Sequence, residues 1–410
     1  MKTISTGILL AAAIATGLLA QAPAGAGRGG FGGPPVKSPE VGPDNRVTLR
    51  LRAPQANAVT VTLGGRTPMT KDEQGVWSAT VGPFEPDYYG YGFVVDGVSM
   101  PDPANPMVKP SVTGGFETLV HVPGPPSLTW ETANVPHGTI THHFYHSALI
   151  GDDRDFYVYT PPGYDPSAKT LYPVLYLFHG LGDEASGWTT AGRANTILDN
   201  LIAQGKAKPM IMVNTLGYGV PNPREGLAAV MGEPEKQFSN FSGAVLGEVL
   251  PIVEKTYKAA KDRNSRAVAG LSMGGAETFF VGLNNIDKFA YVAGFSSAFV
   301  MLPGARGAGG NAGGRGPGRA NDAPAGPPRP AIDPAVFTKA FPALDAKAAS
   351  KLKLLYVACG VDDGLLGSNR AFKDFLKAKG IEFKDVETPG AHTWMVWRRN
   401  LTEIAPLLFR

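Results

Sequence analysis

About two-thirds of the way along, the chain runs Arg266-Ala267-Val268-Ala269-Gly270-Leu271-Ser272-Met273-Gly274-Gly275, an apolar run followed by a glycine-rich turn. Its second half has the pattern Gly-x-Ser-x-Gly. Between a strand and a helix this pattern forms a nucleophile elbow, a strained turn that lifts the serine hydroxyl clear of a sheet. Gly270 and Gly274 leave room for the close backbone approach of such a turn. Because ordinary glycine-rich turns share the pattern, the surrounding sequence has to support this interpretation.

A base for the serine is identified by chain order. An α/β sheet that uses such an elbow places its catalytic groups in the order serine, acid, histidine. Six of the 7 histidines precede Ser272, so His392 is the single histidine that follows it. His392 lies in the turn-rich residues 388–394, before the last predicted helical segment. We therefore expect a loop-borne base at His392.

The acid is expected at the end of a buried strand between these two residues. The apolar run over residues 354–359 predicts such a strand, and Asp362 and Asp363 follow it. One aspartate can orient the imidazole and stabilise its cationic form, while the other can cap the helix that begins near Leu365. Asp363 is the favoured acid, with Asp362 as the alternative.

An oxyanion hole is predicted at the end of an earlier apolar strand, residues 172–178. That strand stops at His179-Gly180-Leu181-Gly182. The backbone N–H of Leu181 can join that of Met273 to bind the developing negative oxygen of a tetrahedral intermediate. His179 is expected to shape this loop rather than to transfer protons.

These motifs resemble the bacterial feruloyl esterase and acetylxylan esterase group of the α/β-hydrolase superfamily, and they are similar to enterochelin esterases. The resemblance is carried by residues 159–164, 172–182 with Trp188, 270–275 and 359–365, and it covers about residues 137–410. It implies serine ester hydrolysis, with Ser272, Asp363 and His392 as nucleophile, acid and base. It implies no metal and no cofactor.

Alternating strand and helix patterns over residues 137–410 predict a mostly parallel sheet with helices on both faces. Examples are strands over residues 210–214 and 291–295 and a helix over residues 242–259. Trp188, Trp394 and Phe299 are candidates for the pocket that binds the acyl group or sugar. Packing in the core is the alternative for each.

The part before this domain is divided by composition. Residues 1–26 have the charged and apolar regions of a signal peptide, and residues 27–43 are a Gly/Pro-rich linker. Alternating strands over residues 44–124 predict a small β-sandwich, which resembles the early-set immunoglobulin-like modules that often bind carbohydrate. Trp77, Tyr88 and Tyr89 are candidates for stacking on sugars, with core packing as the alternative.

Charge and composition exclude some classes of function. The formal net charge of the 410 residues is +3, which gives no reason to expect nucleic acid as a partner. The insertion over residues 304–330 has nine glycines, five prolines and four arginines, so we expect it to be disordered. The single cysteine, Cys359, cannot form an internal disulfide and is expected to be buried.

The leading hypothesis is a secreted or periplasmic serine esterase that removes feruloyl or acetyl groups from plant polysaccharide or oligosaccharide. After signal cleavage no membrane contact is expected. A second hypothesis is an enterochelin-type esterase or another esterase of small molecules. A third is a non-catalytic carbohydrate-binding protein with a vestigial hydrolase domain. The sequence leaves open the acyl group, the sugar backbone and the oligomeric state.

Overall fold

The computed structural model describes residues 35–305 and 332–410. The expected signal peptide and residues 306–330 of the expected disordered insertion lie outside this part of the chain. The stretch Val36–Arg410 is a single compact unit that contains an antiparallel N-terminal part and a large mixed sheet.

The large sheet has eight strands in the order β12-β13-β15-β14-β16-β17-β18-β19. All neighbours from β15 to β19 run parallel, while β12 and β13 form an antiparallel edge. The prediction of an α/β-hydrolase sheet is therefore confirmed. The strands are β12 Thr139–Ser147, β13 Asp152–Thr160, β14 Val174–Phe178, β15 Ile211–Thr215, β16 Arg266–Leu271, β17 Tyr291–Phe295, β18 Leu354–Gly360 and β19 Lys384–Thr388.

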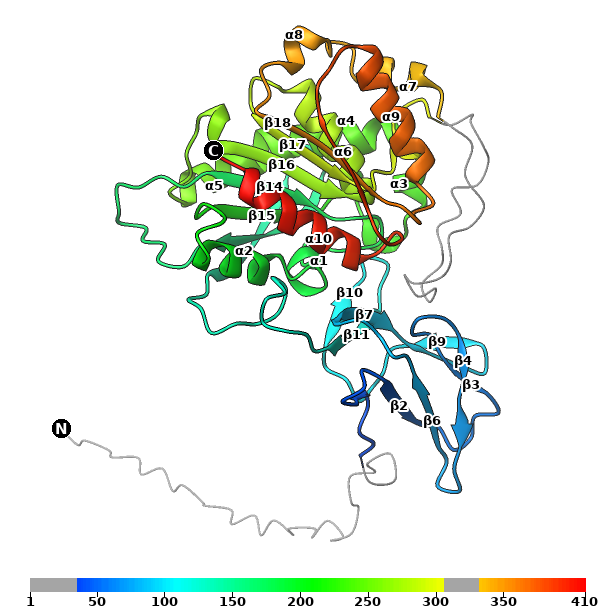
Figure 1. The fold of residues 1–410 in the computed structure, drawn as a ribbon. Coiled ribbons are helices and arrows are strands. Elements are labelled where there is room, and N and C mark those ends of the chain that lie inside the picture. The colour runs from blue at the N-terminus through cyan, green and yellow to red at the C-terminus, as the bar shows by residue number, and fades with distance from the viewer. Residues whose placement is uncertain (1–34, 306–331) are drawn as a thin grey trace, which may run out of the picture. The chain divides into compact units, whose positions relative to one another are not determined.

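Helices cover both faces of this sheet (Figure 1). The alternation of β14 shows how: Leu175 and Leu177 pack with α2 and α10, while Tyr176 and Phe178 pack with α4, α5 and α9 on the opposite face. The helices are α1 Gly187–Thr190, α2 Ala194–Ala203, α3 Ala228–Gly232, α4 Pro234–Ala244, α5 Leu250–Thr256, α6 Ser272–Asn284, α7 Pro334–Ala340, α8 Ala346–Ala349, α9 Leu366–Ala378 and α10 Trp394–Ile404.

The single helix expected over residues 242–259 is instead three segments. Helix α4 ends at Ala244, a π-helical turn spans Val245–Val249, and α5 follows. Pro251 lies in the first turn of α5 and has no N–H to give to the preceding turn. The π-helical turn, which is wider than an α-helical turn, lies directly before the position where this hydrogen bond is missing. Val249 and Val253 of these segments are buried.

The N-terminal part contains three small antiparallel sheets, in the orders β1-β2-β6-β5, β4-β3-β8-β9 and β10-β11-β7. Alternate residues of β2 (Val47, Leu49 and Leu51) point into a common apolar core, which is consistent with a small β-sandwich. The strands are β1 Glu40–Val41, β2 Val47–Arg52, β3 Val59–Val61, β4 Thr67–Pro68, β5 Thr70–Lys71, β6 Val76–Val81, β7 Asp87–Tyr91, β8 Phe93–Val95, β9 Val98–Met100, β10 Val108–Pro110 and β11 Phe116–Val122. We call residues 36–122 the β-module.

The predicted C-terminal boundary of the linker, residue 43, is wrong. Strand β1 pairs with β2, and Ser38 donates a hydrogen bond of 2.6 Å from its Oγ to Oδ2 of Asp102. The β-module therefore begins before residue 43, because a short Gly/Pro-containing segment can still add a strand to a sheet edge.

The three aromatic residues proposed to stack on sugars are core residues of the structure. Trp77, Tyr88 and Tyr89 are only 6–7% exposed. Trp77 donates its indole N–H to the carbonyl of Ala53, and the ring of Tyr88 stacks on His121. Their ring faces are occupied by other side chains, so the packing alternative holds.

A buried ion pair anchors the β-module on the large sheet's outer helix. Asp87 of β7 and Arg398 of α10 are both fully buried, with Oδ1 of Asp87 2.6 Å from Nη2 of Arg398. The same guanidinium donates to the carbonyl of Tyr88. Asp87 thus compensates a cation that would otherwise be buried alone.

Asp87→Asn is expected to lower the free energy of unfolding by about 3–5 kcal/mol, because it leaves the Arg398 charge buried without a counterion. Chemical denaturation of the full chain measures this change. Asp374→Asn is the control, since Asp374 pairs with Lys377 at 3.7 Å on the surface and its loss should change stability by about 1 kcal/mol or less. An equal loss in the free energy of unfolding in the two variants would contradict the anchoring role of the Asp87–Arg398 ion pair.

Candidate active site

Ser272 is held in a strained turn between β16 and α6. Its φ is 54°, in the left-handed region that residues with a side chain rarely adopt. A side-chain carbon on Gly270 would lie 2.3 Å from the carbonyl oxygen of Gly274, and one on Gly274 would lie 2.4 Å from that of His179. Only glycine fits at either position, so the Gly-x-Ser-x-Gly pattern here forms the expected elbow.

His392 lies beside this serine. Its Nε2 is 2.9 Å from Oγ of Ser272. The residue comes from the loop between β19 and α10, and the indole of Trp397 packs edge-on against its ring at 4.9 Å between centroids. The structure therefore places the single downstream histidine within hydrogen-bond reach of the elbow serine, which is the geometry that a general base requires.

Asp363 completes the chain of hydrogen bonds. Its Oδ2 lies 2.8 Å from Nδ1 of His392, and its Oδ1 accepts the N–H of Leu365 at 2.8 Å. Burial opposes ionisation of this carboxyl, but the adjacent His392 and the two hydrogen bonds outweigh it and hold its pKa below the ordinary value. The carboxylate is thus charged where it can fix the imidazole tautomer.

Asp362, the alternative acid, is exposed and takes no part in this arrangement. It does not cap the following helix either, because α9 starts at Leu366 without a side-chain cap. Asp363 itself accepts the N–H at the helix entrance while it contacts the histidine. The structure therefore brings Ser272, Asp363 and His392 together and leaves Asp362 outside.

The predicted oxyanion residues lie on two sides of Ser272. Met273 is in the first turn of α6, where backbone N–H groups have no intrahelical acceptor. Leu181 follows β14, and a side-chain carbon on Gly180 would lie 3.3 Å from Cβ of Ser272. The loop and the helix start therefore both border Ser272, which is the placement that an oxyanion hole needs.

His179 has the loop-shaping position expected for it. It is buried, its Nε2 accepts the N–H of Gly217 at 2.8 Å, and its Nδ1 lies 2.8 Å from the carbonyl oxygen of Gly180. The acceptor role of Nε2 places the ring proton on Nδ1, which donates to Gly180. Burial lowers the pKa of His179, so the ring stays neutral and braces the loop.

The three aromatic residues expected in a substrate pocket are buried. Trp188 is fully buried and donates its indole N–H to the carbonyl of Phe178, and Phe299 packs against Phe279 in the core. Trp394 is 6% exposed and packs edge-on against Trp188. They offer almost no surface to a ligand, so the packing alternative holds for all three.

Sequence reasoning missed a buried polar layer under the elbow. Glu277 of α6 is fully buried, and its Oε1 accepts a 2.7 Å hydrogen bond from Nε2 of Gln237. Gln237 also binds both ends of the turn at Gly217 and Gly219. Burial raises the pKa of Glu277 well above its ordinary value and so favours the neutral carboxyl. The only sequence signal was an acidic residue at an inward-facing position of α6.

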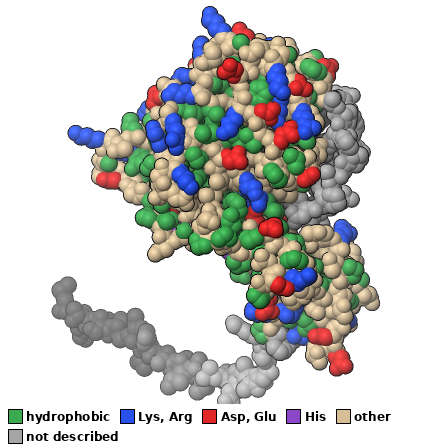
Figure 2. All heavy atoms as spheres, in the orientation of Figure 1, with side chains coloured by type: hydrophobic (Ala, Val, Ile, Leu, Met, Phe, Trp, Pro, Cys, Tyr) green, Lys and Arg blue, Asp and Glu red, His purple; other side chains and the backbone are tan. Residues whose placement is uncertain are grey.

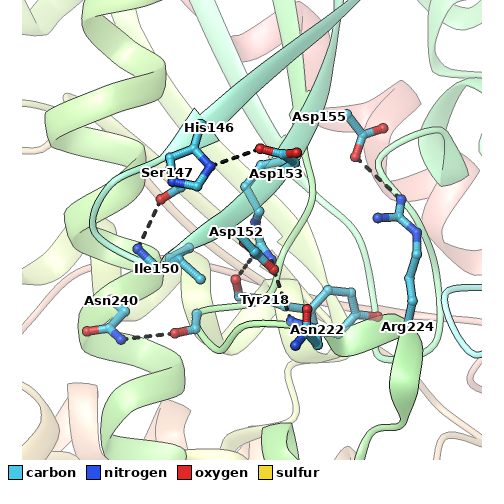
Figure 3. A network of polar contacts seen from close by, with 12 residues as sticks. His146, Ser147, Ile150, Asp152, Asp153, Asp155, Tyr218, Asn222, Arg224 and Asn240 are labelled. Carbon is cyan, nitrogen blue, oxygen red and sulfur yellow. Dashed lines mark hydrogen bonds and ion pairs between the residues drawn. The ribbon is translucent and has the colours of Figure 1, made fainter.

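A second network ties the adjoining loop to β13. The N–H of Asn222 donates to Oδ2 of Asp152 at 3.0 Å, and Arg224 lies 3.7 Å from Asp155 (Figure 3). Tyr218 lies earlier in the same loop, and its hydroxyl accepts the N–H of Gly182 at 2.9 Å. The loop over residues 179–183, called the oxyanion loop after its predicted role, is therefore supported by a second, independently braced loop.

Other kinds of site find little support in the described residues. Within residues 35–305 and 332–410, no group of three or more His, Cys, Asp or Glu side chains is placed to hold a metal ion. No helix of this part is long and apolar enough to cross a membrane. On the face drawn in Figure 2, Lys and Arg are interspersed with Asp and Glu rather than gathered in one basic patch.

Comparison with protein-family models gives a match over residues 147–408 to the family described as "Putative esterase". The chain belongs to this esterase family. The matched region contains the elbow, the acid and the histidine of the site, as well as the predicted oxyanion loop. The family expected from the sequence motifs is thereby confirmed, while the roles of the individual residues remain predictions.

Relatives of this esterase include two named as xylanases. The endo-1,4-beta-xylanase/feruloyl esterase of Xylanibacter ruminicola is 29% identical over 387 residues, 92% of this chain and 46% of that protein. The endo-1,4-beta-xylanase Y of Acetivibrio thermocellus is 31% identical over 153 residues, 35% of this chain and 13% of that protein. The chain thus spans less than half the length of these relatives.

Two solved structures share the fold. The enterobactin esterase of Shigella flexneri has a TM-score of 0.63 at 17% identity, covering 89% of this chain and 93% of that one. A ferulic acid esterase of Anaeromyces mucronatus, in complex with ferulic acid, has a TM-score of 0.54 at 22% identity, covering 70% and 96%. At these identities the likeness is one of fold.

Asp363→Asn is expected to lower kcat for an activated ester by about four orders of magnitude, because the amide stabilises neither the imidazolium nor the right tautomer. Asp362→Asn is the matched control and should leave kcat within about threefold. Steady-state kinetics on p-nitrophenyl acetate compare the two. A larger loss of kcat in Asp362→Asn than in Asp363→Asn would assign the role of the acid to Asp362.

Glu277→Gln is expected to change how stability depends on pH. Because the folded pKa of Glu277 lies above the unfolded value, the unfolded chain releases this proton first as pH rises. The free energy of unfolding then falls by about 1 kcal/mol per pH unit up to the folded pKa. The amide has no proton to lose, so its stability should fall less steeply.

Denaturation between about pH 5 and pH 8 measures this slope. Glu235→Gln, at an exposed position of α4, is the control and should keep the slope of the parent protein. The same slope in all three proteins would show that Glu277 is ionised in the folded state.

Proposed function

We propose that the protein is an exported serine ester hydrolase that removes feruloyl or acetyl groups from plant cell-wall polysaccharide or its oligosaccharides. The observation that carries the hydrolase part is the continuous chain of hydrogen bonds from Ser272 through His392 to Asp363, at 2.9 and 2.8 Å. A serine hydroxyl in that arrangement can lose its proton to the imidazole as it attacks a carbonyl carbon.

The reaction proceeds in two acyl transfers. Oγ of Ser272 attacks the ester carbonyl while His392 takes its proton, and the N–H groups of Met273 and Leu181 bind the resulting oxyanion. The intermediate collapses, the bond from the carbonyl carbon to the sugar oxygen breaks, and His392 gives the proton to that oxygen, which leaves as a hydroxyl. A water molecule then attacks the acyl-serine with the same proton transfers, which releases the carboxylic acid and restores Ser272.

The substrate class is supported by the relatives. The Xylanibacter protein, whose name includes feruloyl esterase, aligns with 92% of this chain, including the β-module. That name joins a xylanase to a feruloyl esterase, which favours esters carried by a plant polysaccharide as the substrate of this chain. Export is supported by residues 1–26, whose pattern is that of a secretory signal.

A fluorophosphonate probe followed by a substrate panel tests the proposal. The probe should label the parent protein and not Ser272→Ala, while Ser239→Ala, a control at an exposed position of α4, should keep full labelling. Labelling that persists in Ser272→Ala would overturn the nucleophile assignment. Absence of labelling in every protein would favour a non-catalytic carbohydrate-binding role.

The panel contains methyl ferulate, acetylated xylan, p-nitrophenyl acetate and a catecholate ester of serine. We expect the highest kcat/KM on one of the two plant-derived esters. The acyl group of that ester then identifies the carboxylic acid that the enzyme releases from its natural substrate. A preference for the catecholate ester by more than about tenfold would instead support a siderophore esterase and overturn the polysaccharide assignment.

A further inference from the structure

The hairpin that joins β10 to β11 reaches out of the β-module to the oxyanion loop. Ser111 forms an antiparallel bridge with Asp183. The N–H of Val112 and the Oγ of Ser111 both donate to the carbonyl of Gly182, each at 3.0 Å. Gly182 directly follows Leu181, the predicted oxyanion donor, so the module binds the backbone next to the reacting centre.

A buried ion pair reinforces this contact. Nζ of Lys109 in β10 lies 2.6 Å from Oδ1 of Asp183 and 3.5 Å from Glu117, and the side chains of Lys109 and Asp183 are about one-tenth exposed. Burial opposes the charge of Lys109, but Asp183 and Glu117 outweigh it and raise the pKa of the amine. Lys109 of β10 therefore stays charged and holds Asp183 of the loop through an ion pair.

Asp183 in turn lies beside Gly180, which also borders Ser272. A side-chain carbon on Gly180 would be 3.5 Å from Oδ2 of Asp183 and 3.3 Å from Cβ of Ser272. The N–H of Asp183 also donates to the carbonyl of Gly180 at 3.2 Å. A displacement of Asp183 would consequently shift Gly180 and Leu181 with respect to the serine.

The hairpin also packs into the apolar cluster around both predicted donors. Val112 is 1% exposed and lies in one cluster with Met273 and Tyr218, against which Leu181 packs. The Tyr218 hydroxyl of the hydrolase domain accepts the N–H of Gly182 and donates to the carbonyl of Asp183. The loop is thus clamped between the hydrolase domain and the β-module.

We propose that the β-module is a working part of the active site, in which Lys109 and Val112 position the oxyanion loop for transition-state binding. Lys109 is a positioning residue, because it acts through Asp183 and does not touch the reacting atoms. This inference rests on the proposed function, since it assigns a purpose to the oxyanion loop of that reaction.

The first test is steady-state kinetics of full-chain Lys109→Met on p-nitrophenyl acetate. We expect kcat to fall about tenfold to hundredfold, a part of the loss seen when an oxyanion donor is removed, while KM changes by about threefold or less. The affinity for a boronic acid, which binds Ser272 as a tetrahedral adduct, should fall by the same factor as kcat/KM. Lys109→Arg keeps the charge and should recover part of the loss.

Lys373→Met is the matched control, because Lys373 is also a buried lysine paired with acidic residues, Asp385 and Glu387, but contacts no part of the oxyanion loop. It should lose a similar amount of thermal stability with kcat and boronate affinity near those of the parent. If Lys109→Met does not fold, Ser111→Ala removes one hydrogen bond to Gly182 with little loss of core and should show a smaller fall in both quantities.

The inference is overturned if Lys109→Met and Lys373→Met have the same kcat and boronate affinity, or if Ser111→Ala matches the parent where Lys109→Met fails to fold. Ser272→Ala separates this result from failure of the proposed function. If Ser272→Ala is inactive and Lys109→Met is fully active, only the positioning role of Lys109 is rejected. If Ser272→Ala is active, the serine mechanism itself is rejected.

Discussion

The left-handed backbone of Ser272 is the constraint on which the rest of the site depends. A φ of 54° at a residue with a side chain is unfavourable, and it persists because β16 and α6 fix both of its ends. The carbonyls that crowd Gly270 and Gly274 leave no space for any other residue. The strain stored there directs Oγ toward His392, so the fold stabilises a conformation that serves the chemistry.

Charges around this turn are placed according to what each must do. Asp363 is buried yet ionised, because His392 and a backbone N–H compensate it. Glu277, on the inner side of α6, is buried, no Lys or Arg within residues 35–305 and 332–410 forms an ion pair with it, and burial raises its pKa. The two carboxyls are separated in protonation state by their environments alone. Only the first can stabilise an imidazolium, while the second is suited to binding the amide of Gln237.

The sequence predicted those parts of the site that depend on local pattern and chain order. Ser272 followed from the elbow motif and His392 from being the last histidine, and the structure brings both together with Asp363. Substrate aromatics were beyond such reasoning, because pocket and core residues have the same composition. Phe299 and Trp188 proved to be fully buried. The antiparallel strands β12 and β13 were also not foreseen, since histidines and acidic residues obscure their alternation.

The contact of the β-module with the oxyanion loop was hidden for a different reason. Lys109 and Asp183 are 74 residues apart, and neither lies in a recognisable motif. A buried lysine is favourable only beside a carboxylate, so this pair makes stability of the interface depend on the position of the loop. A division of the chain by composition separates a module from a catalytic domain, but the hydrogen bonds to Gly182 cross that division. In the proposed mechanism, the smallest unit able to bind an oxyanion is therefore larger than the segment that carries Ser272, Asp363 and His392.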